Sequence, residues 1–380
     1  MSLHQRIAGF DGIRALAVIC VVIQHLGLWQ YAGASGFVAD KLAPLFSGST
    51  GVQAFFILSG FLITILLIKE IRTTGKVSIV AFTVRRSLRI FPLYLLFCLL
   101  ATLALLLSNQ VPWRSLAYAY LYVYNFVPAQ HYVALLGHTW SLAVEEHFYL
   151  VWPVIFSLAY ASNKHRRLML GLAAFIVASL LLHFLLVRQA FSGEYFIARW
   201  SFLAGYNIAL GCIGALLVTR DKPGAAGLLA SPAAFALGIV LYANSLYLDT
   251  GSWFVQNVLC GYIRAPGILL LILWIHQNQG SALVRVLDIR PLRYIGTISY
   301  GIYMWQGFFL STGPKRLEGE VWPPNPYTGL AMLVIVAPLS YRYFEQPFLN
   351  LKQRYMKKRP APAASQRNTD EAEDDLAFRP

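Results

Sequence analysis

The stretch that decides the fold class is residues 51–69, GVQAFFILSGFLITILLIK, which carries no charged side chain before Lys69. A run of this length matches the roughly 20 apolar residues that an α-helix needs to cross a bilayer. Inside it, Ser59 and Gly60 permit either close helix packing or a substrate cavity. Comparable runs recur along the chain, at 10–30, 51–69, 90–108, 138–161, 167–187, 197–219, 226–247, 254–275, 295–311 and 327–345. The sequence therefore predicts an all-α, polytopic membrane bundle of about ten transmembrane helices.

The composition supports a membrane protein and argues against a nucleic-acid-binding one. The 380 residues are 57% hydrophobic and 13% charged, whereas a soluble domain carries about 25% charged residues. The net charge of +14 does not form one basic face, because the basic residues lie in short gaps between apolar runs. The four cysteines fall inside those runs without metal-ligand spacing, so they are expected to be small buried hydrophobes, and no metal site is expected.

The distribution of basic residues predicts the orientation. With the N-terminus in the cytoplasm, alternate gaps hold most of the Lys and Arg residues. The gaps on the opposite side hold Lys41, Arg114, Arg188, Arg199, Lys315 and Arg316. This asymmetry favours cytoplasmic positions for both termini.

Three segments need separate interpretation: a short aromatic stretch, the first apolar run and the C-terminal tail. The stretch 115–127 is aromatic but short, which indicates an interfacial or re-entrant piece. The first run contains Asp11, Arg14 and His25, which a cleaved signal peptide would avoid, so it is expected to stay as the first helix. We therefore predict a transmembrane domain over 1–350 and a disordered cytoplasmic tail over 351–380.

The first run presents a polar stripe. Arg14 and His25 are eleven residues apart, about three turns, so they share one helix face at roughly 16 Å separation. Asp11 lies one turn before Arg14. Ionisable groups inside spans normally face a bundle interior or water, so the stripe predicts one wall of a cavity or channel. The alternative is a pair of interfacial anchors, Asp11 and Arg14, with a hydrogen-bonded His25.

A cluster of arginines precedes the third predicted helix. Arg85, Arg86 and Arg89 lie in VRRSLRIFPLYLL, and Arg86 and Arg89 are neighbours at i,i+3. Two guanidinium groups so placed can clamp a phosphate. The excess of basic residues on the cytoplasmic side of membrane proteins offers an alternative explanation.

Two adjacent carboxylates, Glu145 and Glu146, fall in the outer half of the fourth predicted helix and need partners there. Glu145 shares a face with Ser141, while Glu146 points about 100° away. One carboxylate could orient His25, and the other could pair with Arg264 in the eighth predicted helix. A purely structural salt-bridge network is the alternative.

Six segments, in this order, resemble the membrane-bound acyltransferase family 3. They are FDGIRALAVICVVIQH, GVQAFFILSGFLIT, RRSLRIFPLYLL, HTWSLAVEEHFYLVWP, IGTISYGIYMW and YRYFEQPF. The resemblance implies transfer of acyl groups, commonly acetyl, to extracytoplasmic sugars and related acceptors. The expected location is the bacterial cytoplasmic (inner) membrane.

The resemblance also implies roles for individual positions. Arg14 with His25, and Arg86 with Arg89, match two pairs associated with acyl transfer and acyl-CoA use. Substrate contacts are expected from the matching fourth-helix positions and from the possible cavity residue of the second helix, namely Trp140, Ser141, Glu146 and Ser59. One position departs from the family, because Gln306 stands where histidine is frequent.

The residues and the resemblance together predict an O-acyltransferase. Acyl-CoA, with acetyl-CoA as the expected donor, would lie with its phosphates on Arg85, Arg86, Arg89 and Arg14. His25, supported by Glu145, would act either as a general base for a carbohydrate or glycolipid hydroxyl or as an acyl carrier. The rival class is a transporter of lipid-linked sugars or acyl compounds, although no internal repeat is visible. A third class is a non-catalytic scaffold or sensor.

Overall fold

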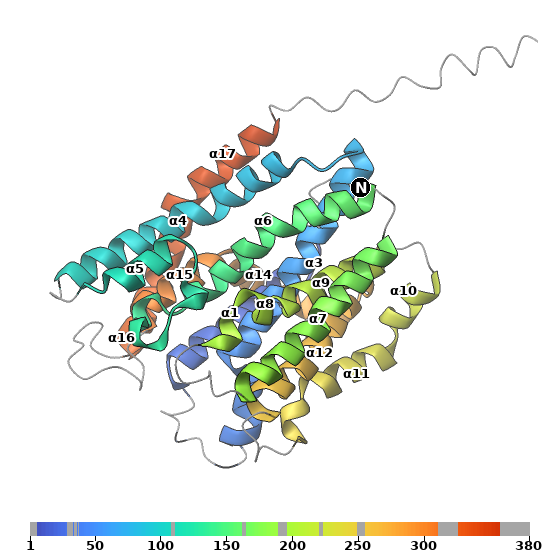
Figure 1. The fold of residues 1–380 in the computed structure, drawn as a ribbon, viewed down its shortest axis with the longest axis horizontal. Helices are drawn as coiled ribbons and strands as arrows, with labels where there is room; N and C mark the ends of the chain where they lie inside the picture. The colour runs from blue at the N-terminus through green and yellow to red at the C-terminus, as the bar shows by residue number, and fades with distance from the viewer. Residues whose placement is uncertain are drawn as a thin grey trace, which may run out of the picture.

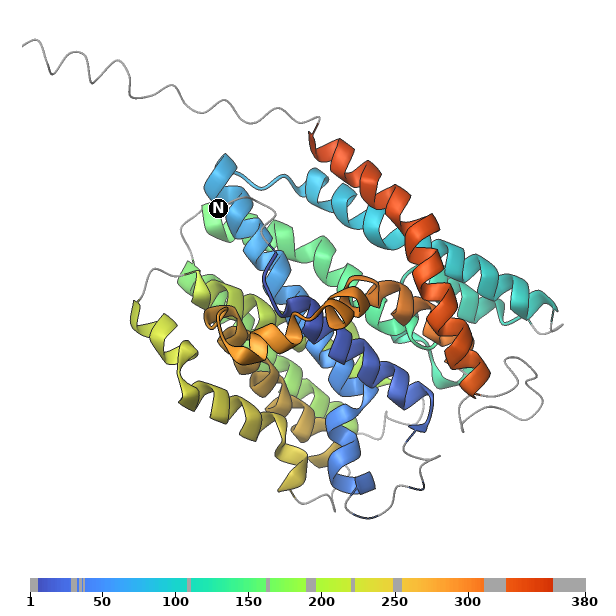
Figure 2. The same cartoon turned by 180° about the vertical axis from the view of Figure 1, so that it is seen from behind.

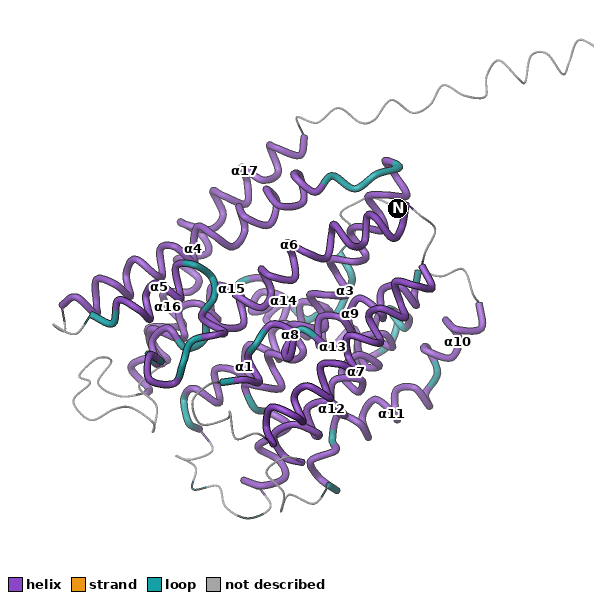
Figure 3. Tube along the Cα trace, in the orientation of Figure 1, coloured by secondary structure: helices purple, strands orange, loops and turns teal. Residues whose placement is uncertain are grey.

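The computed structural model describes residues 6–28, 33, 36, 38–107, 111–161, 165–188, 196–219, 223–248, 255–310 and 326–357. Their regular structure is helical (Figure 3), which confirms the predicted all-α class. Within this part of the chain, six helical segments are long and apolar enough to cross a membrane. They are α3 (Gly48–Thr74), α4 (Ile79–Leu107), α6 (Thr139–Ala161), α7 (His165–Arg188), the pair α8 (Ser201–Ala204) and α9 (Tyr206–Val218), and α12 (Cys260–Gln277).

The other predicted spans are also helical, but they are shorter or interrupted. They comprise α1 (Phe10–His25), α10 (Pro223–Ala230) with α11 (Pro232–Tyr242), α14 (Arg290–Thr297) with α15 (Ser299–Leu310), and α16 (Pro326–Ser340). The break before α11 has a local cause: the Ser231 hydroxyl accepts a hydrogen bond from the Ala234 N–H at 3.1 Å, and Pro232 occupies the first helical position. Ten crossings and two cytoplasmic termini therefore remain predictions.

Short elements connect these helices. The predicted short piece at 115–127 contains α5 (Trp113–Tyr120) and a 3₁₀ turn at Tyr124–Phe126, too little helix to span a bilayer. A further helix, α13, covers Ala282–Leu287. Further 3₁₀ and π turns lie at Val38–Leu42, Ala43–Phe46, Ala129–His131, Ala134–Leu136, Ile197–Arg199, Asn244–Leu246 and Val255–Leu259.

The arginine cluster lies inside a helix and not before it. The third span was expected to begin near residue 90, yet α4 begins at Ile79 and includes Arg85, Arg86 and Arg89. Arg86 is seven residues from the helix start, or about 10 Å along the axis. The arginines are therefore held on a rigid element within the bundle.

The C-terminal part of the described chain is one long helical run. After α16, a π-helical turn at Tyr341–Glu345 leads into α17 (Gln346–Lys357), which lies beside α4 (Figure 1). The predicted start of the tail, residue 351, falls within this helix, whose backbone runs to residue 357, and a disordered tail stays a prediction. Residues 358–380 lie outside the described residues.

Helix α3 is the centre of the bundle. Figures 1 and 2 show α4 and α17 along one edge, α10 and α11 along the opposite edge, and α3 between them. Helices α3 and α9 touch backbone to backbone, because a Cβ added to Gly60 would collide with the Ile208 carbonyl and one added to Gly211 with the Ile57 carbonyl. The packing interpretation of Gly60 is thus confirmed.

The cysteines behave as small hydrophobic residues. All four are free, with Cys98, Cys212 and Cys260 buried and Cys20 partly buried. Among the described residues, no group of three or more His, Cys, Asp or Glu side chains is placed to hold a metal ion.

Candidate active site in two adjoining cavities

A first cavity of about 90 Å³, here called the arginine cavity, is formed by five helices. Helix α1 contributes Arg14 and α4 contributes Arg86 and Arg89, while α6 contributes Ser141 and Glu145. Ser59 of α3 and Tyr300 of α15 complete the polar part of the lining. Arg14, Arg86 and Glu145, which the sequence predicts at different depths of the membrane, therefore line the same cavity.

Arg86 is the most firmly held of these arginines. Its guanidinium lies 3.7 Å from the Glu145 carboxylate and 3.9 Å from the centre of the Tyr149 ring, in a cation–π contact. It also donates a hydrogen bond to the Tyr149 hydroxyl, which is in turn bonded to Ser59. The buried Nε of Arg86 has no hydrogen-bond partner in the structure, so one donor remains for a ligand.

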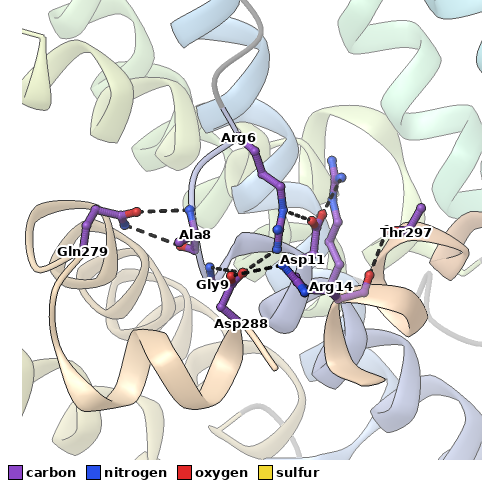
Figure 4. Close-up of polar contacts among 9 residues, drawn as sticks. Arg6, Ala8, Gly9, Asp11, Arg14, Gln279, Asp288 and Thr297 are labelled. Carbon is purple, nitrogen blue, oxygen red and sulfur yellow. Dashed lines mark hydrogen bonds and ion pairs between the residues drawn. The ribbon is translucent and has the colours of Figure 1, made fainter. Parts of the chain in front are cut away.

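Arg14 is connected to a polar cluster at the start of α1 (Figure 4). Its guanidinium lies 3.8 Å from Asp11, and Asp11 accepts a 2.6 Å hydrogen bond from Arg6. Arg6 also pairs with Asp288, which lies 3.8 Å from Arg293. The Asp11 carboxylate thus partly neutralises Arg14 at the edge of the cavity.

Arg85 does not belong to the cavity. It pairs with Glu70 at 2.9 Å, and the same carboxylate accepts a bond from the Ser78 N–H. Successive helical residues are rotated by about 100°, so Arg85 points away when Arg86 and Arg89 face inward. Of the four arginines expected to bind the donor phosphates, Arg14, Arg86 and Arg89 therefore line the arginine cavity and Arg85 does not.

A second cavity of about 390 Å³, here called the histidine cavity, lies beside the first. His25, His138 and His183 line it, together with Arg199 and Arg264. The His25 Nδ1 lies 2.8 Å from the Val21 carbonyl. Since a carbonyl can only accept, Nδ1 carries the proton in the neutral ring and the lone pair is on Nε2.

The two cavities share a wall. Val52, Phe56 and Tyr303 line both of them. The Tyr303 hydroxyl is 2.6 Å from the Ser141 hydroxyl and donates a 3.1 Å hydrogen bond to the His138 carbonyl. The Trp140 ring, on the side of the histidine cavity, packs edge-on against Phe56 with the ring centres 5.9 Å apart. The two cavities therefore adjoin at the side chains of Val52, Phe56 and Tyr303.

The glutamates do not have the partners expected from the sequence. Glu145 pairs with Arg86 in the arginine cavity, whereas His25 and Arg264 line the histidine cavity. Arg264 instead donates a 2.9 Å hydrogen bond to the Thr50 hydroxyl. Glu146 is 9% exposed and lines neither cavity, and its Oε1 has no hydrogen-bond partner in the structure. The two carboxylates diverge because adjacent helical residues point about 100° apart.

Other expected site residues divide between the cavities. Ser59 and Ser141 line the arginine cavity, and Trp140 lines the histidine cavity. Gln306 is fully buried, lines neither cavity, and has no hydrogen-bond partner for its amide in the structure.

Sequence analysis assigned no role to Tyr149, which contacts Arg86, or to the lining residues Tyr303, His138 and Arg199. A signal existed for Tyr149, which lies one turn after Glu145 on the same face. Arg199 was counted only as a charge on the side opposite the termini, and the structure places it in a 3₁₀ turn at Ile197–Arg199.

Fold and cavities together define the class: a helical membrane protein that encloses charged and histidine side chains. The chain belongs to the acyltransferase 3 family, whose model, described as an acyltransferase domain, matches residues 7–341. This confirms the resemblance seen in the sequence.

Relatives of known name are similar over most of the chain. The O-acetyltransferase OatA of Staphylococcus aureus (strain NCTC 8325 / PS 47) is 28% identical over 372 residues, covering 89% of this chain and 56% of OatA. The putative O-acetyltransferase SACOL0978 of Staphylococcus aureus (strain COL) is 25% identical, covering 90% of this chain and 57% of the relative. The chain thus spans little more than half the length of these proteins. No solved structure matches it significantly.

Proposed function

We propose that the protein transfers an acetyl group from acetyl-CoA to a carbohydrate hydroxyl, with the donor at the arginine cavity and the acceptor in the histidine cavity. The observation that carries this proposal is the wall of Val52, Phe56 and Tyr303 common to both cavities. An acyl transferase must bring two substrates together at one point, and this wall is such a point. The names of the relatives, O-acetyltransferases, support the choice of reaction.

The donor side follows from charge and size. Arg14, Arg86 and Arg89 offer guanidinium groups that suit the phosphate oxygens of coenzyme A. The arginine cavity, at about 90 Å³, is smaller than the ~150 Å³ cavity that holds a benzene molecule in an engineered protein. It therefore favours an acetyl group over a long acyl chain.

The acceptor side depends on His25. A sugar hydroxyl attacks the thioester carbonyl while Nε2 of His25 takes the hydroxyl proton. An ester C–O bond forms, the C–S bond breaks, and the departing thiolate takes up a proton to leave as free coenzyme A. The hydrogen bond from Nδ1 to the Val21 carbonyl supports this role, since it leaves Nε2 as the basic nitrogen.

A relay through His25 is the competing course for the same reaction. In it, Nε2 attacks the thioester carbonyl, the C–S bond breaks, and coenzyme A leaves while the acetyl group becomes bonded to the imidazole. The sugar hydroxyl then attacks this acetyl group, the N–C bond breaks, and the released imidazole takes up the hydroxyl proton. Rapid quenching of the protein with radiolabelled acetyl-CoA and no acceptor separates the two courses. Label retained on the wild type and lost in His25→Ala supports the relay; no label on either supports direct transfer.

The test of the function uses the full chain purified into lipid nanodiscs. Acetyl-CoA and a panel of carbohydrates are supplied, release of the coenzyme A thiol is followed, and acetylated sugar is detected by mass spectrometry. We expect thiol release that depends on a carbohydrate and on His25, and that persists in His165→Ala, a substitution at the start of α7. Absence of thiol release, with movement of the intact sugar or acyl compound across proteoliposomes, would refute the proposal in favour of a transporter.

A further inference from the structure

We propose that the histidine cavity binds an acceptor that carries an anionic group, a carboxylate or a phosphate, and that Arg199 and Arg264 hold this group. This inference rests on the proposed function, since it specifies the acceptor of that reaction. Neither arginine was assigned such a role from the sequence.

Arg264 is a buried cation without a counter-ion among the described residues. It lies in α12, is 5% exposed, and makes its hydrogen bond to the neutral Thr50 hydroxyl. Its Nε has no hydrogen-bond partner, and no described carboxylate lies within ion-pair distance. A guanidinium enclosed in a membrane bundle is expensive unless it is paired. Its position on the cavity lining makes a ligand anion the natural partner.

Arg199 reaches the same cavity from another element. Its guanidinium is stacked among the rings of Phe196, Tyr132 and Trp140, at 4.3, 5.3 and 5.7 Å from their centres. The rings fix the plane of the guanidinium and leave its edge for hydrogen bonds. One of its nitrogens is buried and has no hydrogen-bond partner in the structure.

The lining as a whole favours an anion. Two arginines and three histidines line the histidine cavity, and no Asp or Glu occurs among its described lining residues. By contrast, Glu145 already stands among the cations of the arginine cavity. In a medium of low dielectric constant, unbalanced positive charge attracts an anionic ligand group strongly.

The shape and the aromatic side chains favour a sugar as the carrier of the anion. A volume of about 390 Å³ lies within the range of small-molecule pockets, about 300–1,000 Å³. Trp140, Tyr132 and Tyr262 offer apolar faces and, in part, hydroxyl groups at the lining, the combination suited to a ring with alternating C–H and O–H groups. A charged monosaccharide unit fits these features.

The first experiment measures equilibrium binding to the full chain in nanodiscs without acetyl-CoA, so that it does not depend on turnover. The probes share one sugar: glucose, glucuronate and glucose 6-phosphate. We expect at least one charged probe to bind about 100-fold more tightly than glucose, because only the charged probes can pair with the buried guanidinium groups. Comparison of the two charged probes distinguishes a carboxylate from a phosphate ligand.

Substitutions locate the site. Arg199→Gln and Arg264→Gln should each remove most of the preference for the charged probe, whereas Arg199→Lys and Arg264→Lys, which keep the charge, should retain part of it. Arg85→Gln, on a residue paired with Glu70 outside both cavities, is the matched control. Thermal unfolding of each variant shows whether a loss of probe binding is due to misfolding. If a glutamine variant is misfolded, probe binding to the corresponding lysine variant decides the result.

Three results would overturn the inference: equal binding of charged and neutral probes, a preference that survives in both glutamine variants, or competition between acetyl-CoA and the charged probe. The last would assign these arginines to the donor. Failure of the proposed function is recognised separately, because thiol release from acetyl-CoA is then absent whatever the binding data show.

Discussion

The arginine cavity and the histidine cavity differ in how their positive charge is balanced. In the arginine cavity Arg86 is held by Glu145 and by the ring and hydroxyl of Tyr149. In the histidine cavity Arg264 has only the Thr50 hydroxyl, and Arg199 only aromatic faces, among the described residues. A cation that the protein balances itself is fixed before a ligand arrives, while a cation left unbalanced depends on the ligand. The first cavity is therefore suited to positioning and the second to recognition.

The largest expected effect comes from the histidine cavity. His25→Ala should lower the rate of acetyl transfer by about 10²–10⁴-fold, the usual contribution of a positioned general base, and leave acetyl-CoA binding unchanged because His25 does not line the arginine cavity. Transfer kinetics and acetyl-CoA binding in nanodiscs check both statements. An equal loss of donor binding would show that the two cavities do not divide the substrates as proposed.

The second prediction compares two neighbouring residues of α4. Arg86→Gln should lower kcat/KM for acetyl-CoA by about 100-fold and destabilise the protein by about 3 kcal/mol, since it leaves the Glu145 carboxylate without its partner. Arg85→Gln breaks only the contact with Glu70, which is partly exposed, and should cost about 1 kcal/mol or less. Steady-state kinetics and thermal unfolding provide the measurements. If the two variants had similar kcat/KM values and similar stabilities, the placement of Arg86, but not Arg85, in the arginine cavity would be contradicted.

A third substitution makes the arginine cavity resemble the histidine cavity. Glu145→Gln removes the internal carboxylate that competes with a donor anion for Arg86, so acetyl-CoA should bind about tenfold more tightly, or about 1.4 kcal/mol. The rate of transfer should not rise in parallel, because stronger ground-state binding does not accelerate the chemical step. Titration calorimetry with acetyl-CoA tests this; weaker binding would mean that Glu145 itself contacts the donor favourably.

The smallest expected effect lies at the common wall. Tyr303→Phe keeps the ring that separates the cavities but removes the hydroxyl bonded to Ser141 and to the His138 carbonyl. The loss of such a hydrogen bond costs about 1 kcal/mol, and transfer should fall by no more than about tenfold. Thermal unfolding and transfer rates measure it. A loss as large as that of His25→Ala would place the tyrosine hydroxyl in the chemistry.

Sequence reasoning found the helical segments because apolar runs report burial in lipid or protein directly. It also found local neighbours: Asp11 beside Arg14, and Arg86 with Arg89 on one face, are consequences of helical spacing alone. Its error over the start of α4 has a simple origin, since charged residues lower the hydropathy of a segment without ending its helix.

Contacts between distant helices could not be predicted in the same way. Nothing local to Glu145 distinguishes Arg86 from His25 as its partner, because that choice depends on which helices pack together. The same holds for Arg264, whose bond to Thr50 joins α12 to α3. The contacts of Arg199 could not be predicted either, because Tyr132 and Trp140 lie far from it in the sequence.

The backbone contact between α3 and α9 limits how the protein can move during turnover. With Gly60 against the Ile208 carbonyl and Gly211 against the Ile57 carbonyl, sliding of one helix along the other would drive side chains into backbone. Since α3 carries Val52, Phe56 and Ser59, it acts as a fixed axis for both cavities. We therefore expect any opening between donor and acceptor to come from displacement of the other lining helices, α1, α4, α6, α7, α12 or α15, and distance probes on these helices would detect a conformational cycle.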